Sequence, residues 1–137
     1  MHDDASSFWK EFDENKVTHS AAHYLFAIED LLEENGYARA VDISRKLNIT
    51  AGSCSVGLKS LIKKNLIIED ENRFLRLSET GEDIVKDMHR NRETFTSFFR
   101  DILWIKEVEA VINACKIEHL ISSKIGKKLE KYIEEKK

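Results

Sequence analysis

Hydrophobic residues in the first half of the chain recur at intervals of three and four, the spacing of one face of a helix. Leu25, Ile28 and Leu32 share such a face, and Gly36 marks the end of that helix. A three-residue connection separates the next two helices, so this pair predicts a helix-turn-helix. The helices predicted in this half span residues 18–35, 40–47 and 51–64.

Two short runs of β-prone residues follow the helix-turn-helix directly. Residues 66–68 and 74–77 lie on either side of a polar tip, which is the pattern of a β-hairpin. A helix-turn-helix followed by a hairpin is typical of a winged helix, so we expect that fold in this half of the chain.

The second half of the chain returns to helical spacing. Ser78, with Glu82 behind it, is expected to open a long helix that runs towards residue 90. The chain has no proline and five glycines, which favours helices with short connections and predicts a mainly α protein. The further helices predicted here span residues 92–103, 107–120 and 122–135.

Composition indicates where the protein works. Lys and Arg number 22 against 25 Asp and Glu, and no apolar run approaches the roughly 20 residues that span a membrane. The first residues, Met-His-Asp-Asp, are acidic where a secretory signal would be basic. The two cysteines, Cys54 and Cys115, are too few for a disulfide framework. We therefore expect a cytoplasmic protein with no membrane span.

The net charge of -3 conceals an uneven distribution. Residues 36–76 carry eight basic and four acidic side chains, a net charge of +4, which leaves -7 for the remainder. Binding to phosphates depends on local rather than total charge. Charge alone fits a solvated face equally well. Together with the winged-helix pattern, it favours double-stranded DNA as a partner.

The second helix of a helix-turn-helix directs its first residues towards base edges in the major groove. Small residues there permit close backbone approach, and the serine hydroxyls can donate to phosphates or bases. Arg39, before the helix-turn-helix, and Arg76, on the wing, are candidates for phosphate or minor-groove contacts. Cys54 is expected to be a buried core residue. The predicted DNA-binding residues are Arg39, Thr50, Ala51, Gly52, Ser53, Ser55, Val56, Lys59, Lys63 and Arg76.

A candidate metal site lies near the C-terminus. Cys115, Glu118 and His119 are three and four residues apart, so on a helix a thiol, a carboxylate and an imidazole share one face. His23, on the first long helix, would supply a fourth ligand from outside. By spacing alone, a buried cysteine beside an exposed Glu-His pair is an equally good interpretation.

The donor types indicate which ion would bind. Two imidazoles, a thiolate and a carboxylate suit Fe²⁺, Zn²⁺, Co²⁺ or Ni²⁺ better than Mn²⁺, which favours oxygen-rich shells. These ligands would join a helix of the DNA-binding half to the acidic half. The site therefore predicts a switch rather than a purely structural metal.

Four segments, taken in order, resemble one protein family. They lie at residues 36–44, 50–61, 77–82 and 114–119. The chain is similar there, and over about residues 18–137, to the diphtheria-toxin-repressor and manganese-transport-regulator family. The resemblance implies a metal-activated repressor of metal-ion homeostasis that binds its operator as a homodimer, of the shorter type without an SH3-like domain. The implied divisions are a polar extension (1–17), a winged helix-turn-helix (18–78) and a helical metal-binding and dimerisation domain (79–137).

The resemblance also implies a set of metal ligands. The family's first-helix position falls on a histidine beside Tyr24, and the acid one turn later in manganese-type members falls on Phe26, which cannot coordinate. Cys115 is the version found in iron-type members, which makes Fe²⁺ the expected ion. The implied ligands are His23, Cys115, Glu118 and His119.

The family's ancillary metal site is not matched. Its histidine falls on Arg92 and its glutamate on Thr96, so we expect one metal site instead of two. We further expect the Arg92 guanidinium to replace the second cation and to pair with a carboxylate such as Glu118 or Glu29. Two other histidines, each one turn from a matched position, could instead complete an altered site: His19 and His89.

Two other functions fit parts of the sequence. A dimeric winged-helix regulator could respond to thiol oxidation or to a small ligand without metal activation. A metallohydrolase could use Cys115, Glu118 and His119 around a zinc-bound water. That reaction needs an open coordination position, a general base and a substrate cleft, and no motif supplies a second acid or base. We therefore expect no enzymatic activity.

Overall fold

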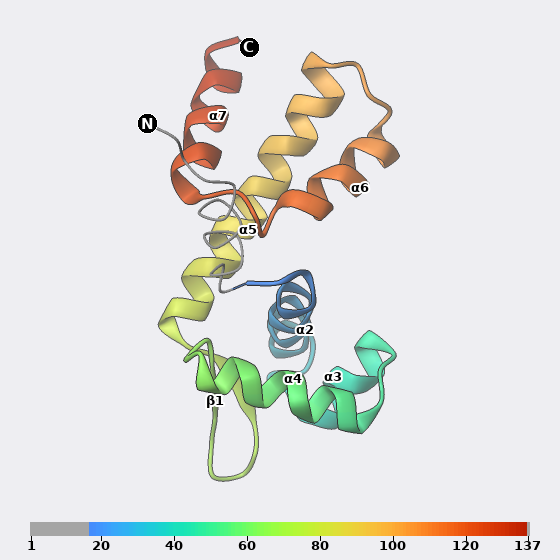
Figure 1. The fold of residues 1–137 in the computed structure, drawn as a ribbon, viewed down its shortest axis with the longest axis vertical. Helices are drawn as coiled ribbons and strands as arrows, with labels where there is room; N and C mark the ends of the chain where they lie inside the picture. Colours follow the sequence, from blue (N-terminus) through green and yellow to red (C-terminus); the bar gives the residue numbers. More distant parts are fainter. Residues whose placement is uncertain (1–16, 137) are drawn as a thin grey trace, which may run out of the picture.

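The computed structural model describes residues 17–136, so the predicted polar extension lies outside the described residues except for Val17. The elements are α2 (His19–Asn35), α3 (Ala40–Leu47), α4 (Ala51–Lys63), β1 (Ile67–Glu69), β2 (Leu75–Leu77), α5 (Glu79–Ser97), the π-helical turn η1 (Phe98–Ile102), α6 (Glu107–Ile117) and α7 (Ser123–Lys136). The long helix α5 joins the two halves, with α3, α4 and the hairpin at one end and α6 and α7 at the other (Figure 1).

The N-terminal half packs around α2. Leu25 and Ile28 of this helix are fully buried, and they share a core with residues of α3, α4, the hairpin and the start of α5. The hairpin is antiparallel, with Ile67 opposite Leu77 and Glu69 opposite Leu75. The predicted order of one long helix, a helix-turn-helix and a hairpin is confirmed in these elements.

Local capping explains where the helices begin and end. The hydroxyl oxygens of Thr18, Thr50 and Ser78 accept hydrogen bonds from backbone N–H groups in the first turns of α2, α4 and α5. Gly36 ends α2 with a φ of 79°, a left-handed conformation that glycine adopts without steric cost.

Helix α4 approaches α2 closely at one point. A Cβ atom added at Gly57 would collide with the Tyr24 ring, so glycine is required for this contact. The Tyr24 hydroxyl donates to the backbone carbonyl of Ser53 over 3.3 Å. Tyr24 follows His23 in the chain, and thus the helix that carries the first predicted metal ligand contacts the helix predicted to enter DNA.

The predicted helix break near residue 91 is wrong, because α5 continues to Ser97. Asn91 is buried inside it, and its amide donates to the carbonyl oxygens of Glu118 and Ile121, each over 3.0 Å. The buried amide nitrogen of Asn91 is thus bonded to a distant turn, and the residue lies within one continuous helix.

Helix α6 is shorter than predicted. It ends at Ile117, and Glu118 keeps a helical backbone conformation as its C-terminal cap. His119 lies in the turn that follows, against which the Asn91 amide is bonded. Two of the predicted ligands therefore lie at the end of the helix instead of along its face.

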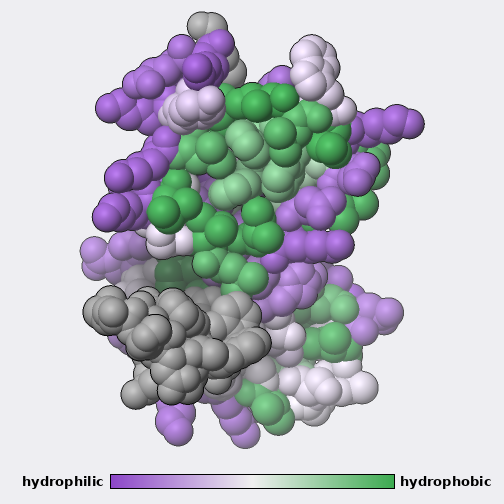
Figure 2. Space-filling model, turned by 45° about the horizontal axis from the view of Figure 1, so that its top comes forward, coloured by the Kyte–Doolittle hydropathy of each residue, from purple (hydrophilic) through white to green (hydrophobic). Residues whose placement is uncertain are grey.

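The C-terminal half exposes a hydrophobic area, which Figure 2 shows across the upper part of the molecule. On α6, Val108 is 73% exposed, and Val111 and Ile112 follow at helical spacing on the same side. Trp104, just before α6, is 87% exposed and has a positive φ of 61°. Trp104 and one face of α6 thus present apolar side chains to solvent in the described residues.

Within residues 17–136 no helix is both long and apolar enough to cross a membrane.

Candidate metal centre

The predicted metal ligands come from three neighbouring segments. His23 lies on α2, Cys115 lies on α6, and Glu118 and His119 lie in the turn that ends α6. The first three line one cavity of about 340 Å³, together with Arg92 of α5. The structure therefore brings residues that are far apart in the sequence to one place, where the two halves meet.

Glu118 is already held by Arg92. The guanidinium donates from Nε to Oε2 over 2.5 Å and from Nη2 to Oε1 over 2.9 Å. The Glu118 side chain is 4% exposed, and its hydrogen bonds raise the pKa of Arg92. The guanidinium also stacks over the Phe26 ring, 4.8 Å from its centroid. The expected pairing of Arg92 with Glu118 is confirmed, and it occupies both carboxylate oxygens.

Thr96 is the residue at the second ligand position of the family's ancillary metal site, where the family has a glutamate. It lies one turn beyond Arg92 along α5 and is half-buried. Asp30, which lines the same cavity, is an acid there that the sequence interpretation did not single out. It lies on α2 one helical turn beyond Phe26, so its position follows from the helix and not from any motif.

Three imidazoles gather beside this cavity. The ring centroid of His19 lies 4.4 Å from that of His23 and 5.2 Å from that of His119. Nδ1 of His119 is buried and, among the described residues, has no hydrogen-bond partner. Partial burial and the nearby His19 lower the pKa of both His23 and His119. Both rings are therefore neutral near pH 7, with nitrogen lone pairs that a metal could use.

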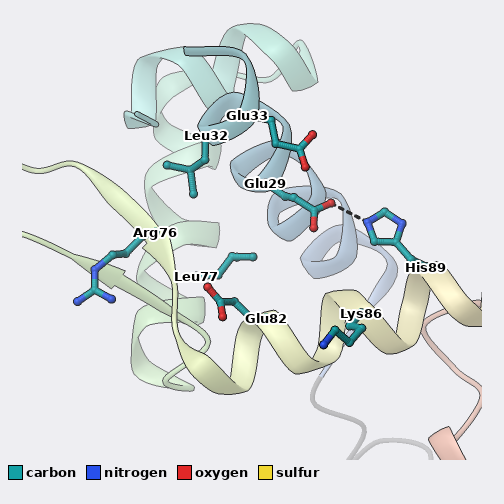
Figure 3. Close-up of a pocket in the computed structure, with 8 residues that line it drawn as sticks. All are labelled: Glu29, Leu32, Glu33, Arg76, Leu77, Glu82, Lys86 and His89. Carbon is teal, nitrogen blue, oxygen red and sulfur yellow. Dashed lines mark hydrogen bonds and ion pairs between the residues drawn. The ribbon is translucent and has the colours of Figure 1, made fainter. Parts of the chain in front are cut away.

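His89, the other additional histidine, lines the same cavity but is bonded to an acid. Its Nε2 lies 2.6 Å from Oε1 of Glu29, and its ring lies against Phe26. Figure 3 shows this pair at one side of a second cavity of about 600 Å³. That cavity was not predicted, because its lining comes from α2, β2 and α5, which no sequence motif links: Glu29, Leu32, Glu33, Arg76, Leu77, Glu82, Lys86 and His89.

These positions fit a metal ion only in part. Across residues 17–136, no three side chains of His, Cys, Asp or Glu have their donor atoms arranged to hold an ion. The unpartnered Nδ1 of His119, the second imidazole of His23 and the half-buried thiol of Cys115 fit a transition metal in chemistry and location. Glu118 does not fit, because a guanidinium already neutralises it.

The predicted DNA-binding residues are all exposed, whereas Cys54 between them is 1% exposed, as expected of a core residue. Arg39, Ser55 and Lys59 line a groove of about 560 Å³ bounded by α3, α4 and the hairpin. Val56 is 71% exposed on the outer side of α4. Among these residues, Arg39 is bonded to Asp42 over 3.1 Å, and this ion pair raises its pKa.

Comparison with known proteins places this arrangement in a family. Residues 78–137 match the model of the iron dependent repressor metal binding and dimerisation domain. The HTH-type transcriptional regulator MntR of Bacillus subtilis (strain 168) is 32% identical over 106 residues, covering 77% of this chain and 74% of that protein.

Solved structures share the fold. The hypothetical protein SSo2273 from Sulfolobus solfataricus has a TM-score of 0.75 at 18% identity, covering 87% of this chain and 91% of that one. IdeR of T. acidophilum has a TM-score of 0.64 at 25% identity, covering 86% of this chain and 55% of the other. The chain therefore belongs to the diphtheria-toxin-repressor and manganese-transport-regulator family of metal-dependent transcriptional repressors.

Proposed function

We propose that this member is a homodimeric DNA-binding repressor of metal-ion homeostasis in the cytoplasm, and that a divalent metal held between its two halves activates it. The observation that carries this proposal is the meeting of α2 and the end of α6 at His23, Cys115 and His119. Helix α2 contacts α4, the helix predicted to enter DNA, and α6 carries the exposed hydrophobic face.

The DNA-binding part is a winged helix spanning residues 18–78. Helix α4 is the recognition helix, with Thr50 at its N-terminal cap and the small exposed residues of its first turns directed towards the major groove. Lys59 and Arg39, on the walls of the groove beside α4, contact phosphates. The local charge of +4 over residues 36–76 favours this partner.

The dimer forms through the C-terminal domain, residues 79–137. The exposed face of α6 presents Val108, Val111 and Ile112 beside Trp104, and apolar surface of this kind marks a protein interface. Aromatic residues contribute strongly at such interfaces, and Trp104 is already presented to solvent by a left-handed backbone conformation. The occupant is a second copy of the chain, since the matching family domain is a dimerisation domain.

The chain's own contacts explain how the metal site is coupled to DNA. His23 is adjacent to Tyr24, whose hydroxyl is bonded to α4 at Ser53. On the other side, Asn91 and Arg92 of α5 hold the backbone and the side chain of Glu118. A bound metal supplies Lewis-acid bonds that link imidazole and thiolate donors of the two halves. The orientation of α4 relative to the dimer then depends on those donors.

The donors also define the class of ion. Imidazole and thiolate ligands favour Fe²⁺, Zn²⁺, Co²⁺ or Ni²⁺ over Mn²⁺, and Fe²⁺ is the physiological ion that we propose. No ancillary metal site is expected. Arg92 stands where the family has a histidine ligand of that site, and Thr96 stands where the family has a glutamate ligand.

The other two functions considered from the sequence are not supported. The relatives are transcription regulators, and the matching domain is the metal binding and dimerisation domain of iron dependent repressors. These matches do not favour a regulator that works by thiol oxidation or by a small ligand alone. The same relatives point away from an enzyme.

A DNA-binding measurement tests the proposal. Duplexes would be selected from a randomised pool with Zn²⁺-loaded protein, and the affinity of the selected duplex would be measured at fixed salt in EDTA, in Zn²⁺ and, without oxygen, in Fe²⁺. We expect metal to tighten binding by about five- to 150-fold, the range of typical allosteric coupling. Equal affinity in EDTA and in both metals contradicts a metal-activated regulator.

A further inference from the structure

The histidine cluster contains one member that the family's ligand set does not include. His19 begins α2, one turn before His23, and its ring lies close to both His23 and His119. The spacing of four residues on one helix and the end of α6 bring the three rings together. Three imidazoles from two segments lie where the donor set implied by the resemblance contains only two.

Glu118 lacks the freedom to be the remaining ligand. Each of its oxygens accepts a hydrogen bond from Arg92, and the side chain is nearly fully buried. A divalent ion bound to Glu118 would lie next to the guanidinium, and two positive charges at contact distance repel each other strongly where water is scarce. Releasing Arg92 instead would leave a cation beside the Phe26 ring without its carboxylate.

His89 is excluded by its own contacts. It lines the same cavity as His23 and Cys115, but its Nε2 is bonded to Glu29 over 2.6 Å and its ring packs on Phe26. Binding a metal through Nε2 of His89 would break the bond to Glu29 and disturb the ring's contact with Phe26. His19 needs no such change, since it and His23 are both exposed and lie within one turn of each other on α2.

We propose that His19 takes the place of Glu118 as a metal ligand, so that His19, His23 and His119 bind the ion together with the thiolate of Cys115. This inference rests on the proposed function, because it assigns the ligands of the same metal centre. The donor atoms are not already arranged around a point in residues 17–136. The site therefore forms by rotation of the side chains, and the backbone of α2 and α6 keeps the rings within reach.

This ligand set has a chemical consequence. Three neutral imidazoles and one thiolate make a four-coordinate N₃S site of the kind that Zn²⁺ and Co²⁺ accept. With Glu118 retained by Arg92, no carboxylate oxygen remains in the set to favour a harder ion such as Mn²⁺. Arg92 thus contributes to metal selectivity without touching the metal, by removing the acid from the site.

Titration of the protein with Co²⁺ tests the assignment, because thiolate-to-Co²⁺ charge transfer and the ligand-field bands report binding without any DNA. The variants are His19→Ala, the matched control His89→Ala, and Glu118→Gln. We expect His19→Ala to weaken Co²⁺ binding by at least about tenfold, the effect that even loss of an outer-shell partner can have. Binding by the His89→Ala control should change less than about twofold, and Glu118→Gln should weaken binding less than His19→Ala does.

The outcomes separate the two proposals. If the wild-type protein binds Co²⁺ but His19→Ala binds it equally well with unchanged bands, His19 is not a ligand and only this inference fails. A large loss in Glu118→Gln with none in His19→Ala also overturns it and restores Glu118. If the wild-type protein binds no Co²⁺, the metal centre of the proposed function fails as well. Circular dichroism of each variant verifies that the fold is retained.

Discussion

Replacing Arg92 by alanine measures how strongly the Arg92–Glu118 pair holds the end of α6 against α5. The change leaves the Glu118 carboxylate buried without a counter-charge and removes the contact of the guanidinium with Phe26. Removing one partner of a fully buried pair costs about 3–5 kcal/mol, whereas surface pairs contribute about 0–1 kcal/mol. Because Arg92 is 36% exposed, water partly screens the pair, and we expect a loss of about 2–3 kcal/mol in the free energy of unfolding.

Urea unfolding in EDTA, at one protein concentration because dimerisation adds to stability, gives this number. Lys46→Ala is the matched control, since Lys46 pairs with Glu34 over 3.1 Å on the surface, and it should cost less than about 1 kcal/mol. Arg92→Lys should recover part of the loss, because lysine keeps the charge but cannot bond to both oxygens at once. If Arg92→Ala costs no more than Lys46→Ala, the pair does not hold the two helices together.

Three further predictions concern the other surfaces. Val108→Asp puts a charge on the exposed face of α6 and should convert the dimer to a monomer in analytical ultracentrifugation. The control Lys116→Asp should leave the protein dimeric. A dimeric Val108→Asp protein would place the interface elsewhere. Lys59→Ala should weaken DNA binding uniformly across sequences and lower the slope of log affinity against log salt by about 1, and an unchanged slope would show that Lys59 touches no phosphate. Iodoacetamide at neutral pH should label Cys115 but not Cys54, because burial raises the pKa of the Cys54 thiol and shields it from the reagent. If mass spectrometry shows both cysteines labelled without urea, Cys54 is not packed in the core.

The N-terminal elements were predictable because their signals are local. The spacing of Leu25 and Ile28, the turn at Gly36 and the β-prone runs each act within a few residues. The break predicted near Asn91 was wrong because the partner of that side chain, the turn after α6, is far away in the sequence. Helix ends that depend on tertiary hydrogen bonds leave no local pattern to interpret.

The sequence predicted the residue types of the candidate metal site but not all of their pairings. Residue types and helical spacing indicated a metal centre, and the replacement of a ligand position by Arg92 indicated an ion pair. The sequence could not decide which acid Arg92 would choose, because Glu29 and Glu118 are equally plausible by type, and the structure gives Glu29 to His89 instead. The proximity of His19 to His119 likewise depends on how α2 packs against α6.

The central claim is that metal binding and DNA binding favour the same arrangement of the two halves. Linkage then requires each ligand to strengthen the other by an equal factor. The most direct measurement is the Co²⁺ dissociation constant of the wild-type protein, with and without a saturating amount of the selected duplex, at fixed salt. We predict that the duplex lowers this constant by the same factor, about five- to 150-fold, by which Co²⁺ tightens DNA binding. A Co²⁺ dissociation constant that is unchanged by the duplex would contradict the claim.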